Sequence, residues 1–343
     1  MKRKVFEFAN PYSVSLVEQE IPEVPGEHEV YIRTAHTTIS SGSEKANYLG
    51  DNNVTPNPDI IPTWPRYCGY AVSGTVMAIG EKVTNVKIGD RVILGTGGGI
   101  HANINCVPDH KVVKVPDNVS LSEASMTFIS VFPLSAIRKT RLEPGDSALV
   151  MGLGNLGCFA IQQLRHFGAY PVIAADPVKE RREFALSLGA DYAFDPFEPD
   201  FAKKVKAVTP GCKGVNVAIE VTGVGSALDT TLDCMAKMGR VALLGCTRDK
   251  NFTIDYYRKV HGNGVQLIGA HIGATPELES AYGFKTQCDE SRIILNLLAG
   301  GRISFKQFVT VHDNPHNCAE VYKRLVEDKN FPIGYQFDWE GIE

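Results

Sequence analysis

Three glycines with the spacing G-x-G-x-x-G follow a short apolar run and open an amphipathic segment: Gly152, Gly154 and Gly157. In this pattern the first glycine permits a tight turn, the second lets a pyrophosphate approach the backbone, and the third lets a helix pack closely on a strand. A helix that begins at Asn155 offers the free N–H groups of its first residues, Asn155 and Leu156, and the positive end of its dipole to a diphosphate. The spacing therefore predicts a dinucleotide-binding turn.

An acidic residue after the next apolar run indicates which dinucleotide would bind. Asp176 lies 19 residues beyond Gly157, where a carboxylate accepts hydrogen bonds from both ribose hydroxyls and repels a 2′-phosphate. NAD(H) is therefore favoured over NADP(H). Arg181 and Arg182 follow closely and weaken this preference slightly, although solvated helix residues are the commoner fate of such a pair.

Strands that alternate with helices are needed to position these residues, and the chain from about residue 145 shows that alternation. Short apolar runs predict strands, and amphipathic segments, several of them ended by glycine, predict helices. In chain order these segments are Ser147–Met151, Asn155–Phe167, Pro171–Ala175, Lys179–Leu188, Tyr192–Phe194, Phe201–Val208, Val215–Val221, Ser226–Met238, Arg240–Leu244 and Val265–Gly269. The order predicts an α/β fold with a doubly wound parallel sheet, covered by helices on both faces.

The two ends of the chain differ from this central part in composition and in their predicted secondary structure. Residues 1 to about 120 are rich in Gly, Pro and short β-branched runs, which predicts a compact, irregular β domain. The tail carries two predicted helices, Ser291–Ala299 and Asn317–Glu327, and a last strand, Ile333–Phe337. We expect this tail to return to the β domain.

Composition excludes several classes of protein. The 343 residues suffice for about two domains, and a hydrophobic content of 43% argues against disorder. Lys+Arg 35 against Asp+Glu 39, with a net charge of −4 and no basic patch, disfavours nucleic-acid binding. No run approaches the ~18 apolar residues of a membrane span. Glu7, Asn10 and Pro11 interrupt the segment that follows the basic start, so it lacks the apolar run of a signal peptide. We expect a cytoplasmic protein with a small-molecule substrate, no membrane partner and eight reduced cysteines.

Four segments together make the sequence resemble the medium-chain dehydrogenase/reductase family, in its zinc alcohol and polyol dehydrogenase branch: Gly69–Gly80, Lys87–Val92, Glu143–Asp146 and Glu220–Gly223. The resemblance covers nearly the whole chain. It implies a GroES-like catalytic domain (1–128 and 274–343), a Rossmann dinucleotide-binding domain (129–273) and an active site in the cleft between them. It also implies a homodimer or homotetramer, in which strands near Val265–His271 continue the sheet across subunits.

The sequence departs from the family where the catalytic zinc is held. The family's first ligand, a cysteine, is matched by Ser41 (or Ser40), and the second, a histidine, by Tyr70. The third ligand falls near Thr127, in a stretch without Cys or His. Hydroxyl side chains are poor zinc ligands.

The family's structural zinc lobe, with four closely spaced cysteines, is also missing. Cys106 alone lies in that region. A relocated site built from His36, Cys68, Glu44 and His101 matches no known spacing. We therefore expect no bound metal.

Without zinc, another group must give or take a proton while hydride moves. The aligned candidates are Tyr70, Ser43, Glu44 and Ser41. The Tyr70 phenol could donate to a carbonyl oxygen, Ser43 matches the hydroxyl that relays the proton in the zinc enzymes, and Glu44 could orient the relay. Lys45 could lower a neighbouring phenol pKa. The alternatives are that Tyr70 packs against the sheet and that Glu44 and Lys45 form a structural ion pair.

Two residues after later strands are candidates to contact the nicotinamide. Family analogy places Thr222 at the nicotinamide edge. His271 ends a predicted strand and could contact the substrate or the carboxamide, although a lone histidine there is more often structural.

The expected function is therefore zinc-independent, NAD-dependent hydride transfer to or from a secondary alcohol, sugar or polyol, or its ketone. Two alternatives stay open. One is an NAD(P)H-dependent enone or quinone reductase, in which charge delocalises over the acceptor and no metal is needed. The other is a non-catalytic NAD-binding protein.

Overall fold

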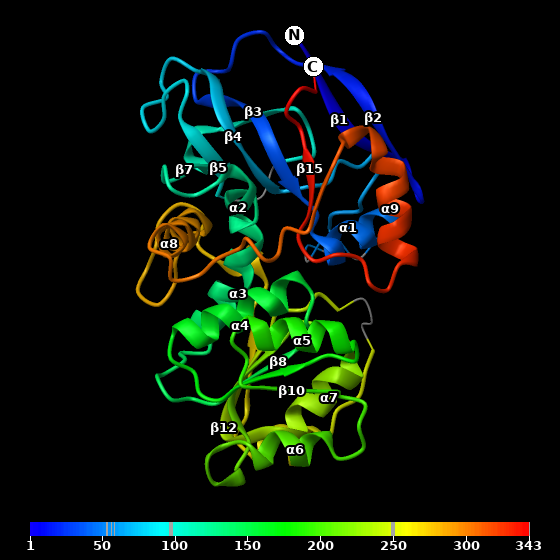
Figure 1. Cartoon of the computed structure of the whole chain (residues 1–343), viewed down its shortest axis with the longest axis vertical. Coiled ribbons are helices and arrows are strands. Elements are labelled where there is room, and N and C mark those ends of the chain that lie inside the picture. The colour runs from blue at the N-terminus through cyan, green and yellow to red at the C-terminus, as the bar shows by residue number, and fades with distance from the viewer. Residues whose placement is uncertain (53, 56, 58, 96–98, 248–250, 343) are drawn as a thin grey trace. The chain divides into compact units, whose positions relative to one another are not determined.

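The chain divides into two compact units in a computed structural model that describes residues 1–52, 54, 55, 57, 59–95, 99–247 and 251–342 (Figure 1). Unit 1 comprises Met1–Ile129 and Ser291–Glu343, and unit 2 comprises Ser130–Glu290. The sequence assigned residues 274–290 to the same domain as the tail, whereas their contacts group them with unit 2.

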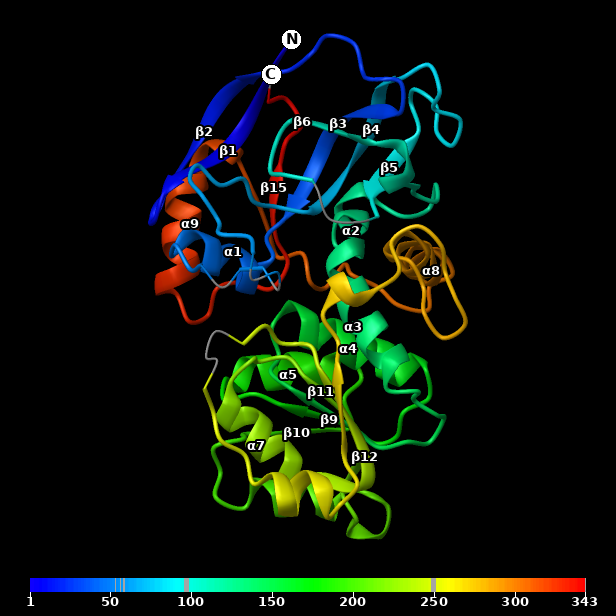
Figure 2. The same cartoon turned by 180° about the vertical axis from the view of Figure 1, so that it is seen from behind.

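Unit 2 contains a parallel sheet with the strand order β10-β9-β8-β11-β12-β13. Its strands are β8 (Ala148–Met151), β9 (Val172–Ala175), β10 (Tyr192–Phe194), β11 (Val215–Glu220), β12 (Met235–Leu243) and β13 (Gln266–Gly269). Its principal helices are α4 (Asn155–His166), α5 (Lys179–Ser187), α6 (Phe201–Ala207) and α7 (Gly225–Asp233). Helices α4 and α5 lie over one face of the sheet, and α6 and α7 over the other (Figures 1 and 2). The predicted doubly wound α/β fold is confirmed.

One predicted helix is shorter in the structure. The sequence predicts a helix over Ser226–Met238, whereas α7 ends at Asp233 and β12 begins at Met235. Met235 pairs with Val215 of β11, after which the register shifts. The register shift leaves Met238 exposed at a φ of +62°. Pairing with β11 at the sheet thus overrides the helical pattern of the sequence.

The parallel strands of unit 2 bring their carboxyl ends to one edge of the sheet. Gly152, Asp176, Thr222 and His271 follow β8, β9, β11 and β13 at this edge. The strand order runs one way from β8 to β10 and the other way from β11 to β13. Ligands of doubly wound proteins bind where the order reverses, which here is between β8 and β11.

Unit 1 contains a seven-stranded sheet built from both ends of the chain, with the order β14-β15-β3-β4-β5-β7 and with β6 paired to β3. The strands are β3 (Glu29–Thr38), β4 (Ala71–Ile79), β5 (Arg91–Leu94), β6 (Ile104–Pro108), β7 (Val112–Lys114), β14 (Val311–Asp313) and β15 (Tyr335–Asp338). Antiparallel pairing places Gln336 of β15 opposite Thr38 of β3. The tail therefore returns to the β domain, as the sequence predicts.

A two-stranded ribbon and several helices complete the fold. The ribbon pairs β1 (Lys2–Asn10) with β2 (Ser13–Glu20). Figure 2 shows α9 (Cys318–Glu327) beside this ribbon and beside α1 (Ser41–Tyr48). The remaining helices are α2 (Leu121–Ser125), α3 (Thr127–Lys139), where the chain passes from unit 1 to unit 2, and α8 (Gln287–Ala299), where it returns.

Two expectations about the whole chain can be compared with the fold. Within the described residues, no helix is long and apolar enough to cross a membrane. All eight cysteines, each of them among those residues, are free of disulfide bonds.

Candidate active site

The glycine-rich turn of unit 2 joins the end of β8 to the start of α4. Gly152 has a φ of +97°, which favours glycine, and its N–H donates to the Ala175 carbonyl oxygen at 2.8 Å. Gly154 is the N-cap of α4, and no side chain caps the helix there. The first N–H groups of α4 therefore have no partner within the helix and can bind a diphosphate.

The space around the second and third glycines differs. A Cβ on Gly157 would lie 1.9 Å from the Gly152 carbonyl oxygen, whereas a Cβ on Gly154 would meet no heavy atom within 4 Å. Gly157 thus serves helix–strand packing, and Gly154 leaves open space at the helix N-terminus. This cradle fits the pyrophosphate of a dinucleotide.

Alanine at these two glycines should affect two different properties, stability at Gly157 and cofactor affinity at Gly154. Gly157→Ala is expected to lower the free energy of unfolding by about 1–3 kcal/mol, because its Cβ overpacks the turn. Gly154→Ala, at φ −78° and ψ −165°, should keep its stability and lose about tenfold or more in NADH affinity. Thermal denaturation and fluorescence titration with NADH measure the two effects. Equal melting temperatures for Gly157→Ala and the unmodified protein would contradict the packing role.

Asp176 ties the turn to the end of β9. Its side chain is buried, and its Oδ2 and Oδ1 atoms accept the N–H groups of Leu153 at 2.9 Å and Val178 at 2.8 Å. Arg181 Nη1 lies 3.9 Å from Oδ2. A carboxylate has about four acceptor positions, so Asp176 can also accept ribose hydroxyls.

Arg182 has a different role from Arg181. It donates to the carbonyl oxygens of Asp176 at 2.7 Å and Pro177 at 2.9 Å, and it lies 3.5 Å from the Asp195 carboxylate. Arg182 is therefore a structural residue of the β9–α5 connection rather than a solvated one.

Thr222 packs against the glycine turn and is held by Glu220. The buried Glu220 carboxylate accepts both the N–H of Thr222, at 2.8 Å, and its hydroxyl. Burial raises the pKa of Glu220, and these bonds from Thr222 oppose the rise. A Cβ on Gly152 would lie 2.9 Å from the Thr222 methyl carbon, so Thr222 borders the predicted binding edge.

His271 follows β13 and caps a short turn. Its Nδ1 accepts the N–H of Gly273 at 3.0 Å. Burial, and secondly the positive charge of Lys139, lower the pKa of His271. The ring is therefore neutral at pH 7 and carries its proton on Nε2, which remains the nitrogen that could contact a ligand.

Unit 1 contains a cluster of three hydroxyls, Ser40, Ser43 and Tyr70, which we call the hydroxyl cluster. The Tyr70 hydroxyl is hydrogen-bonded to Ser40 Oγ, and Ser43 Oγ lies 3.5 Å from the phenol oxygen. The half-buried Tyr70 ring meets the Phe128 ring edge-on, with 5.6 Å between centroids. Tyr70 directly precedes β4, and the serines lie at the start of α1.

The start of α1 is held by Glu44 rather than by the Ser40 side chain. Ser40 is the N-cap residue, but its side chain makes no capping hydrogen bond. Instead, Glu44 Oε1 accepts the Ser40 N–H at 2.7 Å. The Ser40 hydroxyl is thereby available to Tyr70.

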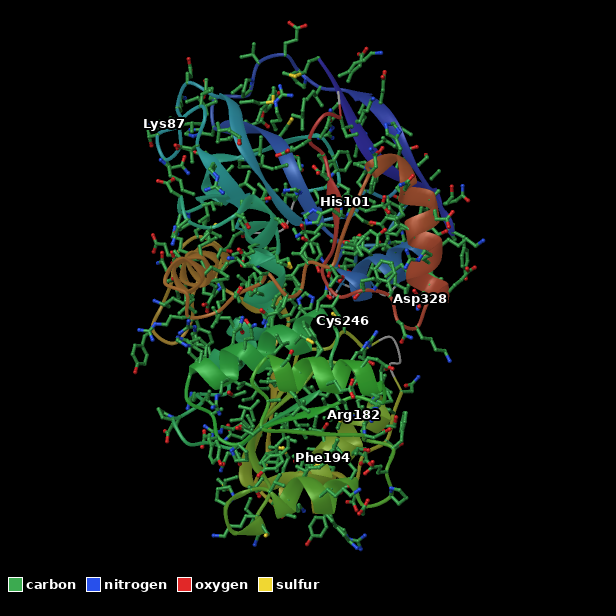
Figure 3. The ribbon with its side chains drawn as sticks, in the orientation of Figure 1. Lys87, His101, Arg182, Phe194, Cys246 and Asp328 are labelled. Atoms are coloured by element: carbon green, nitrogen blue, oxygen red, sulfur yellow. The ribbon has the colours of Figure 1, made fainter. Side chains whose placement is uncertain are left out.

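Glu44 is buried with His101 and Tyr322. Its side chain is 1% exposed and those of the other two are fully buried; Figure 3 shows His101 in the interior of unit 1. Glu44 Oε2 lies 2.9 Å from His101 Nε2 and accepts the Tyr322 hydroxyl. Burial, and secondly the charge of Glu44, hold the pKa of Tyr322 well above its usual value. Tyr322 therefore stays protonated and donates.

The structure brings together some of the predicted catalytic residues. Ser43 and Tyr70 belong to the hydroxyl cluster, and Glu44 orders it through Ser40. Ser41 begins α1, but the hydroxyl bonded to Tyr70 belongs to Ser40.

The alternative ion pair between Glu44 and Lys45 is not formed. Lys45 donates instead to the Val326 carbonyl oxygen of α9 at 3.3 Å. Sequence reasoning missed Tyr322 and considered His101 only as a zinc ligand, because neither lies in a motif.

The residues at the family's ligand positions do not fit a zinc ion. Ser41 and Tyr70 supply only hydroxyls, and Thr127 is buried at the start of α3. Within the part of the chain that the structure describes, no group of three or more His, Cys, Asp or Glu residues could hold a metal. The relocated set of His36, Cys68, Glu44 and His101 is therefore not such a group.

Comparisons with known proteins give matches over both units. The family model of the alcohol dehydrogenase GroES-like domain matches residues 26–117, and that of the zinc-binding dehydrogenase matches residues 155–285. The L-threonine 3-dehydrogenase of Pyrococcus horikoshii is 32% identical over 288 residues, which cover 75% of this chain and 79% of that protein. The D-guloside 3-dehydrogenase of Escherichia coli K12 is 26% identical over 290 residues, 82% of each chain.

Solved structures resemble the whole chain. The 2R,3R-butanediol dehydrogenase from Bacillus subtilis superposes with a TM-score of 0.83 at 24% identity, over 98% of this chain and 99% of that one. At this identity the likeness supports the fold.

Proposed function

Since this chain belongs to the medium-chain dehydrogenase/reductase family and is an oxidoreductase of the CH–OH class, we propose that it transfers hydride between NAD(H) and a secondary alcohol, sugar or polyol, or the corresponding ketone, without zinc. The curated relatives are named as dehydrogenases of L-threonine and of D-gulosides. They do not favour the enone reductase or the non-catalytic protein.

The observation that carries the proposal is the hydroxyl cluster. During ketone reduction, Tyr70 donates its proton to the substrate oxygen, and during alcohol oxidation its oxygen takes the proton back. Ser40 Oγ, bonded to the phenol oxygen, donates to the phenolate and stabilises its charge. Ser43 Oγ lies 3.5 Å from the phenol oxygen and is a second hydroxyl that can relay the proton.

The residues that bind the cofactor in this proposal all belong to unit 2. Nicotinamide, when bound, supplies or accepts the hydride. The turn residues Gly152, Gly154, Asn155, Leu156 and Gly157 hold the diphosphate. Asp176 binds the adenosine ribose beside Arg181, and Thr222 and His271 border the nicotinamide end.

The choice of NAD over NADP is supported by Asp176. Its carboxylate would repel a 2′-phosphate. Of the two nearby arginines, Arg182 is already bound to main-chain oxygens of the β9–α5 connection, which leaves Arg181 beside the ribose.

Turnover after metal removal tests the proposal. Secondary alcohols, sugars and polyols are screened with NAD, and enones and quinones with NADPH, before and after treatment of the protein with a zinc chelator. We expect NADH formation with a hydroxylated substrate, unchanged by the chelator, and less than one tightly bound metal per chain by elemental analysis. One zinc per chain whose removal abolishes turnover, or turnover only of enones or quinones, would overturn it.

A homodimer or homotetramer is part of the proposal. Strand β13 is the last strand of the unit 2 sheet, and Gln266 and Leu267 on it are exposed. An exposed edge strand offers unpaired backbone groups to a second copy. Sedimentation at the mass of one chain would exclude this assembly.

A further inference from the structure

A buried carboxylate, that of Glu44, is hydrogen-bonded to the backbone of the hydroxyl cluster at Ser40. Glu44 is a residue of α1 and has three hydrogen-bond partners: the Ser40 N–H at the start of the same helix, and the His101 ring and the Tyr322 hydroxyl from distant parts of the sequence. Burying a charged group is costly unless donors surround it. Glu44 has three such donors, so the arrangement can hold it as a carboxylate.

The direction of these hydrogen bonds follows from the donors. Trp339 Nε1 can only donate, and it donates to Thr37 Oγ1 at 2.9 Å. Thr37 Oγ1 lies 2.6 Å from His101 Nδ1. Because the Glu44 carboxylate can only accept, the proton between His101 and Glu44 lies on Nε2, and we assign the Thr37 hydroxyl as the donor to Nδ1. Every proton in this series of hydrogen bonds, from Trp339 to Glu44, then has an acceptor.

His101 also holds the residue that precedes Tyr70. The main-chain N–H of His101 donates to the Cys68 carbonyl oxygen at 2.9 Å. A Cβ on Gly69 would lie 2.5 Å from the His101 ring, and Gly69 has a φ of +98°. His101 thus contacts both segments that supply the hydroxyl cluster, the start of α1 through Glu44 and the Gly69–Tyr70 segment through the backbone.

The Ser40 hydroxyl departs from its usual role at a helix N-cap. A serine there normally accepts an N–H of the first turn, a bond worth about 0.5–2 kcal/mol. Here that bond is absent, and the Glu44 carboxylate binds the Ser40 N–H instead. A local rule broken in this way is typical of a functional site.

We propose that Glu44, His101 and Tyr322 form a positioning triad that keeps Ser40 Oγ against the Tyr70 hydroxyl during proton transfer. The triad touches neither substrate nor cofactor in this role; it fixes the geometry of the groups that do. The inference rests on the proposed function, because it takes Tyr70 as the proton donor.

A double-mutant cycle tests the triad. Tyr322→Phe removes one donor to Glu44 and retains the ring that packs edge-on against Phe8. We expect it to lower kcat about tenfold, because small displacements of reacting groups have large effects on rate, with the KM for NAD unchanged. In a Tyr70→Phe background the same change should alter kcat less than twofold, because the group it positions is gone.

The matched control is Tyr48→Phe. Tyr48 lies on α1 in the same aromatic cluster, 5.8 Å from the Tyr322 ring between centroids, and the triad does not include it. Its loss of a hydroxyl should leave kcat unchanged. A kcat for Tyr322→Phe that equals the Tyr48→Phe value, or an undiminished effect in the Tyr70→Phe background, would overturn the triad.

A second pair of variants covers the case in which Tyr322→Phe does not fold. Thr37→Val removes the hydroxyl that holds His101, whereas Thr37→Ser retains it. We expect kcat to fall about tenfold in the first and to return in the second. Equal kcat values for the two would overturn the triad. If Tyr70→Phe alone retains full turnover, it is the proposed function that fails, so the two failures are distinguishable.

Discussion

Replacing Tyr70 by phenylalanine is expected to lower kcat about 10²–10⁴-fold, the usual contribution of a positioned acid or base. The phenol oxygen bonded to Ser40 is lost, while the ring that meets Phe128 edge-on stays. The KM for NAD should change little, because the residues that we propose to bind the cofactor belong to unit 2. Initial rates with the best alcohol from the substrate screen measure both constants.

Tyr67→Phe is the control for this prediction. Tyr67 lies three residues earlier, and its exposed hydroxyl donates to Glu7 at 2.8 Å. Its removal should leave kcat within about twofold of the unmodified value, as surface substitutions usually do. Full turnover by Tyr70→Phe would show instead that Tyr70 only packs against the sheet.

The second large effect is expected at Asp176. Asp176→Asn should weaken NADH binding about 10- to 100-fold, because a hydrogen bond to a charged group contributes about 1.5–3 kcal/mol. The same change removes the charge that repels a 2′-phosphate, so NADPH affinity should rise relative to NADH affinity. Fluorescence titrations with both nucleotides give the ratio.

Arg181→Ala separates the two possible cofactors. Arg181 Nη1 lies 3.9 Å from the Asp176 carboxylate. If NAD is the cofactor, its removal should change NADH affinity about threefold or less, in line with a partly exposed ion pair. A loss of tight NADPH binding in Arg181→Ala, together with unchanged NADH binding in Asp176→Asn, would identify an NADP enzyme.

Local patterns predicted unit 2 well because its elements follow local rules. The glycine turn, the apolar strands and the glycines that end helices occur within a few residues of one another, and α4 and α5 begin where the sequence predicts. The error at Met235 arose where pairing with Val215 decides between helix and strand. Periodicity within one segment does not contain that information.

The candidate active site was predicted only in part because its contacts are distant in sequence. Glu44 is 57 residues from His101 and 278 from Tyr322, and no spacing rule links such positions. The short helix α1, with Ser, Gly and Ser among its first residues, lacks the apolar periodicity that predicts a helix. Tyr70 and Ser43 were found through their alignment with the family's ligand and relay positions.

The sheet of unit 1, with β15 paired to β3, has a consequence for biosynthesis. Ser40, Glu44 and Tyr70 leave the ribosome early, whereas Tyr322 and Trp339 emerge after the whole of unit 2 has been made. Domains generally fold in the order of their synthesis, and unit 2 can bury its core first. Glu44 cannot acquire its full set of donors until the last residues of the chain are available. The groups that we propose for proton transfer are thus among the first to be translated and the last to be fixed in position.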